Sequence, residues 1–163
     1  MGWVSFAARL LVGGVWLVAG LIKLPDLASS VRAVRAYQLL PEAVVPAVGY
    51  ALPILEVVVG LLLLAGLLVR GAAVVSGVLF LAFVVGIASA WARGLQIDCG
   101  CFGGGGYKAN AAEDYPWEIA RDLGLLLASA WLVWRPRSPW AVDNRLLYDD
   151  ARPERTLTGE PTR

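Results

Sequence analysis

An uninterrupted run of uncharged residues, 71–92, constrains this chain more than any other feature. The apolar core of a bilayer is about 30 Å thick, and a helix needs about 20 residues to cross it. The composition agrees with a membrane location, since 58% of the 163 residues are hydrophobic and only 17% are charged. We therefore expect an all-α integral membrane protein whose surroundings are the lipid bilayer.

The same reasoning predicts three further spans on either side of this run. They cover about residues 3–24, 43–69 and 115–135, and each is mostly apolar. A tight turn at Arg70-Gly71 would make the second and third spans antiparallel neighbours. The sequence thus predicts a four-helix transmembrane bundle.

Residues 25–41, between the first two spans, have a different pattern. Val31 and Val34 recur at helical spacing, whereas Arg32 and Arg35 point another way. This pattern is typical of a short amphipathic helix at the membrane interface.

The chain divides into one membrane domain, 3–135, and a polar tail, 136–163, that we expect to be partly disordered. The 14 basic and 13 acidic residues leave a net charge of +1, so no surplus charge favours nucleic acid as a partner. The chain has no histidine, which excludes sites within it that depend on imidazole.

The only two cysteines, Cys99 and Cys101, stand one residue apart in a loop after the third span, called here the Cys loop. A bridge between such close residues closes a small, strained ring, and strained, exposed disulfides are labile and oxidising. This favours redox cycling between dithiol and disulfide. A passive structural bridge, a metal shared with a second chain, and lipidation remain alternatives. Two sulfurs supply too few ligands for a closed metal site, so we predict no metal in this chain alone.

The neighbours of the two cysteines affect how they react. Asp98 disfavours a thiolate on Cys99, which makes Cys101 a slight favourite as the attacking thiol. The glycines 103–106 are either a flexible linker or a means for the dithiol to reach a partner or a membrane-embedded acceptor.

Two ionisable residues, Arg9 and Glu56, lie deep in the predicted spans. Counting about 1.5 Å per residue from Lys23 and Val44 places them at similar depths of about 21 and about 18 Å. An unpaired ion at such depth costs at least about 2.5 kcal/mol, so we predict an Arg9–Glu56 ion pair inside the bundle. The pair either fixes the helix register, or Glu56 handles a proton when a bound quinone or thiol changes redox state.

Arg121 and Asp122 occupy the first turns of the fourth predicted span, close to the Cys loop. A nearby cation lowers a cysteine pKa, so these two residues are candidates for tuning the thiols. Ordinary anchoring at the membrane interface is the alternative role. With no histidine present, proton handling falls to Glu56, Asp98, Asp122, water or a partner protein.

A set of motifs spreads over about residues 3–135. It comprises Arg9, Gly20-Leu-Ile-Lys23, Tyr37 with Leu40-Pro41, Pro53-Ile-Leu-Glu56 with Gly60, Arg93-Gly94, Asp98-Cys99-Gly100-Cys101-Phe102-Gly103, and Trp117 with Arg121 and Asp122. This set resembles the DoxX-like membrane proteins, and specifically the MauE branch associated with methylamine utilisation. The Cys block is the specific part of the resemblance.

The resemblance implies a four-helix membrane protein that supports disulfide formation or thiol redox traffic outside the cytoplasm. MauE is linked to disulfide formation during methylamine dehydrogenase maturation. A thioredoxin-like partner is implied by analogy alone.

Together these inferences predict a membrane thiol–disulfide redox protein that exchanges electrons with an extracytoplasmic thioredoxin-like protein. A quinone near Arg9 and Glu56 is the candidate onward acceptor, and no other cofactor is indicated. Such a chain is a thiol–disulfide oxidoreductase or a component of one. The alternative is a non-catalytic assembly subunit that docks an oxidoreductase.

Basic residues near the ends of the spans give only a small bias in orientation. We expect both termini in the cytoplasm and the Cys loop outside the cell membrane, partly because the loop then faces an oxidising compartment.

Overall fold

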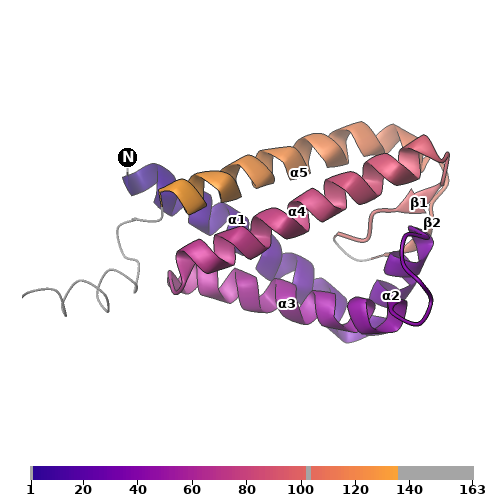
Figure 1. The fold of residues 1–163 in the computed structure, drawn as a ribbon, viewed down its shortest axis with the longest axis horizontal. Coiled ribbons are helices and arrows are strands. Elements are labelled where there is room, and N and C mark those ends of the chain that lie inside the picture. Colours follow the sequence, from indigo (N-terminus) through magenta and orange to yellow (C-terminus); the bar gives the residue numbers. More distant parts are fainter. Residues whose placement is uncertain (1, 102–103, 136–163) are drawn as a thin grey trace, which may run out of the picture.

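The computed structural model describes residues 2–101 and 104–135, which are mostly helical (Figure 1). The predicted polar tail, 136–163, lies outside the described residues. The body consists of four long helices: α1 (Gly2–Lys23), α3 (Val45–Ala65), α4 (Val69–Ala92) and α5 (Ala111–Trp134).

Short elements connect these helices at one end of the molecule. The segment between α1 and α3 holds a 3-10 turn, η1 (Leu24–Asp26), and a short helix, α2 (Leu27–Ala36). The Cys loop joins α4 to α5 and holds two short antiparallel strands, β1 (Ile97–Asp98) and β2 (Gly106–Tyr107). The predicted short helix between the first two spans is therefore present as α2.

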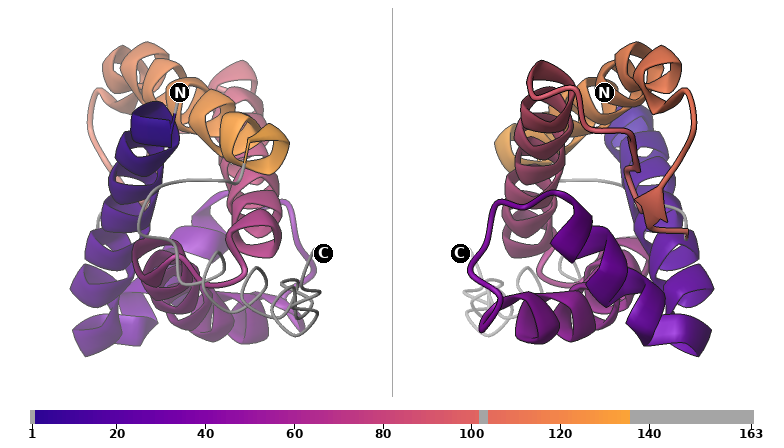
Figure 2. Two further views of the ribbon diagram at one scale, coloured as in Figure 1. Left: turned by 90° about the vertical axis from the view of Figure 1, so that its left-hand side faces the viewer. Right: turned by 90° about the vertical axis from the view of Figure 1, so that its right-hand side faces the viewer.

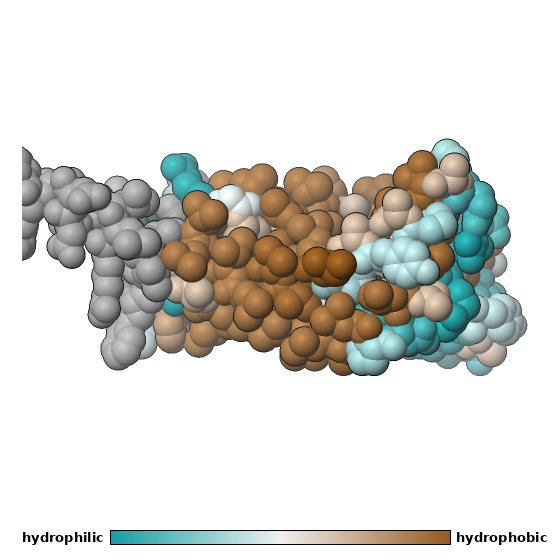
Figure 3. Space-filling model, turned by 90° about the horizontal axis from the view of Figure 1, so that it is seen from below, coloured by the Kyte–Doolittle hydropathy of each residue, from teal (hydrophilic) through white to brown (hydrophobic). Residues whose placement is uncertain are grey.

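Three helical segments of the described residues are long and apolar enough to cross a membrane: 2–36, 45–65 and 69–92. Helix α5, the predicted fourth span, has 24 residues and carries its charges in its first half. Apolar side chains cover the middle of the face seen in Figure 3, and hydrophilic ones gather at the end that holds α2 and the Cys loop. The fold is that of an all-α membrane protein.

Seen end-on, the four long helices follow one another in the order α1, α5, α4, α3 (Figure 2). Glycines let α1 and α3 pack closely, because a Cβ on Gly60 would lie 2.7 Å from Leu17 N and one on Gly20 would lie 2.9 Å from Pro53 O. Gly13 faces Gly60 in the same contact, whereas a Cβ on Gly14 would meet no described atom within 4 Å. Small residues thus set the α1–α3 distance, as is common in membranes.

A neutral hydrogen-bonded cluster lies in the middle of the bundle core. The indole Nε1 of Trp16 donates to Ser76 Oγ at 2.6 Å, and Ser76 Oγ lies 3.0 Å from Ser129 Oγ. Ser129 Oγ also donates to Leu125 O at 2.9 Å, and Trp16 stacks on Phe80 with ring centroids 4.4 Å apart. We call Trp16, Ser76 and Ser129 the serine cluster.

The turn between α3 and α4 occupies residues 66–68, so the predicted turn at Arg70-Gly71 is wrong. Gly66 adopts a φ of 72°, and this left-handed conformation ends α3 because glycine enters it without steric cost. Arg70 instead lies in the first turn of α4, where its Nε donates to Val133 O at 3.2 Å.

Candidate functional site

The Cys loop is fastened to two helices, α2 and α5, by side chains that bond its backbone. Tyr115 on α5 donates its hydroxyl to Leu95 O at 2.7 Å and accepts from Ile97 N at 3.1 Å. Tyr37, at the end of α2, donates its hydroxyl to Cys99 O at 2.9 Å. These bonds hold the two cysteines over one end of the bundle.

Glycines in the Cys loop allow it to lie directly on α2. Gly100 has a φ of +69° and Gly105 a φ of +118°, and a Cβ on either would come within 2.8 Å of Ala33 Cβ. Ser29 Oγ also donates a hydrogen bond to Gly104 O. These glycines therefore serve close packing against α2 and a left-handed backbone that other residues rarely adopt.

Both cysteines are free thiols buried at this contact, with exposed fractions of 6% for Cys99 and 7% for Cys101. The interaction with the neighbouring Cys99 thiol is the main cause that raises the pKa of Cys101. Burial and the charge of Asp122 raise that pKa further, while Arg121 acts in the opposite direction. The sequence-based preference for Cys101 as the attacking thiol stays a prediction.

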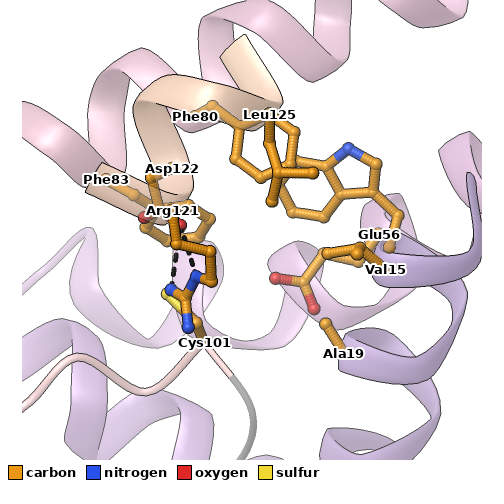
Figure 4. Close-up of a pocket in the computed structure, with 10 residues that line it drawn as sticks. Val15, Ala19, Glu56, Phe80, Phe83, Cys101, Arg121, Asp122 and Leu125 are labelled. Carbon is orange, nitrogen blue, oxygen red and sulfur yellow. Dashed lines mark hydrogen bonds and ion pairs between the residues drawn. The ribbon is translucent and has the colours of Figure 1, made fainter. Parts of the chain in front are cut away.

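Charged side chains line a small cavity beneath Cys101 (Figure 4). Arg121 Nη2 contacts Asp122 Oδ1 at 2.8 Å, and the Glu56 carboxylate faces them across the cavity. Its volume of about 10 Å³ corresponds to roughly one water molecule. Glu56 Oε2 and Asp122 Oδ2 are buried and have no hydrogen-bond partner among the described residues.

The partner of Glu56 in the structure is Lys23, so the predicted Arg9–Glu56 pair is replaced by a different one. Lys23 Nζ lies 2.6 Å from Glu56 Oε1, and the side chains are only 3% and 0% exposed. Lys23 is buried in the protein, and the chain continues from it through η1 and α2 alongside α3. Gly20 packs beside Pro53, which brings the end of α1 to the level of Glu56.

Arg9 lies in the other half of α1. It is buried, and its guanidinium carbon lies 5.4 Å from the centre of the Phe6 ring. Gly13 packs against Leu63 and Leu64, so α1 and α3 run antiparallel and Arg9 is about 16 Å along the helix from Gly20. Arg9 therefore belongs to the end of the bundle away from the thiols.

We call Lys23, Glu56, Arg121 and Asp122 the charged cluster. Three of these residues, Glu56, Arg121 and Asp122, were candidate site residues in the sequence analysis. The structure places all three at the cavity that Cys101 lines. Asp98, a fourth candidate, accepts a hydrogen bond from Gly100 N at 3.0 Å, which shapes the backbone between the cysteines.

The sequence predictions did not assign a role to several residues that the structure places near the cysteines. Lys23 was expected only to end a helix, and Tyr37 and Glu118 had no assigned function. Glu118 on α5 interacts electrostatically with the Cys99 thiol. Glu118 could have been identified from the sequence, because it lies about one helical turn before Arg121 and Asp122. No feature of the sequence predicts that Lys23 pairs with Glu56.

Comparison with known proteins identifies similar sequences but no similar structure. The family model described as "Methylamine utilisation protein MauE" matches residues 1–135. A curated "Methylamine utilization protein MauE" from Paracoccus denitrificans is 34% identical over 103 residues, which are 63% of this chain and 55% of that protein. The chain thus spans about half the length of the curated relative it matches. None of the solved structures matches the chain.

Proposed function

The chain belongs to the methylamine utilisation protein MauE family, and from this premise we propose that it is a membrane thiol–disulfide redox protein. The observation that carries the proposal is the pair of buried free thiols, Cys99 and Cys101, with Cys101 lining the same cavity as Glu56, Arg121 and Asp122. The name of its relative suggests that the process served is methylamine utilisation.

Oxidation of the two thiols releases two protons and two electrons as the S–S bond forms. Glu56 and Asp122 each have one buried oxygen without a described partner, and both line the cavity that Cys101 faces. Either carboxylate is suited to receive a thiol proton through a water in that cavity. Arg121 stabilises the Cys101 thiolate, since its charge acts to lower the pKa of that thiol.

The proposed redox partner is an extracytoplasmic thioredoxin-like protein. Thiol–disulfide exchange requires one sulfur to attack another directly, and both sulfurs here are buried against α2. Exchange therefore requires the Cys loop to lift from Ala33, where Gly100 and Gly105 now pack. We place this loop outside the cell membrane and both termini in the cytoplasm.

Trapping thiols by alkylation in intact cells tests this function. The variants are Cys99→Ser and Cys101→Ser, and Ala109→Ser is the matched control in the same loop. In the wild type and the control, we expect the fraction of alkylated thiol to change with respiration. A membrane-impermeant reagent added from each side reports the location of the loop. If both Cys variants still support oxidation of the partner, the redox function is wrong.

A second candidate function is supported by the burial of both thiols. A non-catalytic assembly subunit would use the Cys loop only as a shaped docking surface for an oxidoreductase. This function predicts thiols that never change state and a stable complex that survives replacement of either cysteine. The same trapping experiment, combined with co-purification of the complex, separates the two functions.

A further inference from the structure

Helices α2, α3 and α4 enclose an apolar cavity of about 270 Å³ beside the Cys loop. Its walls are almost entirely hydrocarbon, and the aromatic side chains among them are Tyr37 and Phe83. Several of its other wall residues, such as Leu39 and Leu40, are exposed on the outside of the bundle. A molecule in this cavity would therefore enter from the bilayer and not from water.

A second, smaller cavity of about 20 Å³ adjoins the first and is polar at its inner end. The two cavities share four wall residues: Val34, Tyr37, Leu52 and Phe83. The smaller one is also lined by Lys23, Ser30 and Cys99. An apolar space that opens towards lipid thus leads to an ammonium group, a hydroxyl group and a thiol.

The polar groups at the inner end are positioned for a ligand. Ser30 is 4% exposed, and its Oγ has no hydrogen-bond partner among the described residues. Lys23 is also 4% exposed, and its amine keeps donor capacity beyond its bond to Glu56 Oε1. A buried hydroxyl without a partner costs free energy that an acceptor on a bound molecule would recover.

We propose that the two cavities together bind a membrane quinone, with its ring between Tyr37 and Phe83 and one carbonyl oxygen near Ser30 and Lys23. The positive charge of Lys23 is already balanced by Glu56, which favours a neutral carbonyl acceptor over the carboxylate of a fatty acid. The isoprenoid tail leaves through the apolar cavity between the helices. Cys99 places a reducing thiol at the polar end of the same site.

The reaction at this site balances without a further reagent, and it rests on the proposed redox function. Two S–H bonds break at Cys99 and Cys101, and one S–S bond forms between them. The two electrons and two protons pass to the quinone, whose two carbonyl oxygens become the hydroxyl groups of a quinol. The quinol then leaves into the bilayer.

This site differs from the one expected from the sequence, where a quinone was placed near Arg9 and Glu56. Arg9 lies at the other end of α1. Glu56 reaches the proposed site only through its ion pair with Lys23.

Binding of a short-chain ubiquinone or menaquinone analogue to the full chain in phosphatidylcholine nanodiscs tests the proposal. Ala82→Phe fills the apolar cavity from an exposed position on α4, and Ala88→Phe is the matched control on another face of the same helix. We expect saturable binding in the wild type and the control, and at least tenfold weaker binding in Ala82→Phe. Ser30→Ala should weaken binding about fivefold, the contribution of one neutral hydrogen bond.

The outcomes separate the site from the redox function. Absence of saturable binding in the wild type, or unchanged binding in both Ala82→Phe and Ser30→Ala, would overturn the site. Displacement of the quinone by palmitate at equal concentration would identify a lipid acyl chain as the occupant and also overturn it. A Cys99→Ser/Cys101→Ser variant should bind quinone without reducing it. If the wild type binds quinone but its thiols stay reduced, the redox function fails while the site stands.

Discussion

Two buried polar clusters lie in the same helical bundle and differ in how far their hydrogen-bonding capacity is used. In the serine cluster, Trp16, Ser76 and Ser129 are neutral, and each polar side chain has a partner within 3.0 Å. In the charged cluster, Glu56 Oε2 and Asp122 Oδ2 are buried without a partner among the described residues. Trp16 and its stacking partner Phe80 also line the cavity that holds Glu56, Arg121 and Asp122, so the two clusters are neighbours.

The difference indicates what each cluster contributes. A neutral network inside a membrane protein, in which every polar group has a hydrogen-bond partner, strengthens helix packing and needs no additional partner or ligand. Partnerless carboxylate oxygens in hydrocarbon cost free energy, and such groups are usually kept for function. Glu56, Arg121 and Asp122 line the cavity beneath Cys101, whereas Ser76 and Ser129 do not, which agrees with a role in proton transfer for the charged cluster and in packing for the two serines.

The largest expected effect comes from breaking the ion pair in the charged cluster. Glu56→Gln leaves the buried Lys23 ammonium without an anion, which should lower the free energy of unfolding by about 3–5 kcal/mol. A double variant, Lys23→Met with Glu56→Leu, removes both charges and should restore most of that stability. Unfolding in mixed micelles with increasing SDS measures both values.

Thiol oxidation distinguishes a functional ion pair from a purely structural one. The double variant should remain folded yet oxidise its thiols more slowly than the wild type, because one of the two candidate proton acceptors, Glu56, is missing and only Asp122 remains. If a stable double variant oxidises its thiols at the normal rate, the Lys23–Glu56 ion pair has only a structural role, like the serine cluster.

The next effect concerns the pH dependence of Cys101. Its pKa is raised in the folded chain, so the thiolate forms only as the pH rises above the ordinary range of a cysteine. Arg121→Gln removes a cation that lowers this pKa and should shift the profile to higher pH, whereas Asp122→Asn removes an anion that raises it and should shift the profile to lower pH. Each substitution should change the alkylation rate of Cys101 at a fixed pH severalfold, downwards for Arg121→Gln and upwards for Asp122→Asn.

Alkylation of a Cys99→Ser background at several pH values measures these shifts for Cys101 alone. Ser129→Ala, in the serine cluster, is the control and should leave the profile unchanged. Shifts in the same direction for Arg121→Gln and Asp122→Asn would contradict the assigned electrostatics.

The comparison also shows which parts of the molecule the sequence could predict. Uncharged runs such as 71–92 identify helices directly, because the bilayer requires both length and apolar composition. The closeness of Arg121 and Asp122 to the thiols followed from the order of the spans. The pairing of Lys23 with Glu56 did not, since it depends on Gly20 packing beside Pro53.

The burial of the two thiols against α2 could not be predicted from the sequence either. Four consecutive glycines suggest a flexible linker as readily as a packed loop. Only the contact of Gly100 and Gly105 with Ala33 on α2 shows that the described part of the Cys loop lies against the bundle. Such contacts join segments that are far apart in the chain, so local sequence patterns cannot predict them.

A smaller effect is expected where the Cys loop is fastened above the charged cluster. Tyr37→Phe keeps the ring but removes the hydroxyl that donates to Cys99 O, which should cost about 1 kcal/mol. The loosened loop should expose the thiols more often and raise their alkylation rate severalfold. Tyr107→Phe is the control, since Tyr107 is 82% exposed, and it should change neither quantity. Equal alkylation in both variants would show that the Tyr37 bond does not hold the loop.

The smallest effect should come from the serine cluster itself. Ser76→Ala removes the acceptor of the Trp16 indole and one partner of Ser129, while Ser129 keeps its bond to Leu125 O. Hydrogen bonds between membrane helices contribute about 0.6 kcal/mol on average, so unfolding in SDS should shift by about that amount. Thiol alkylation and quinone binding should stay at wild-type values, because Trp16, Ser76 and Ser129 carry no charge that could change the pKa of either cysteine. If Ser76→Ala changed the rate of thiol oxidation as much as Glu56→Gln does, the two clusters would act as one network. The serine cluster would then also contribute to the redox function.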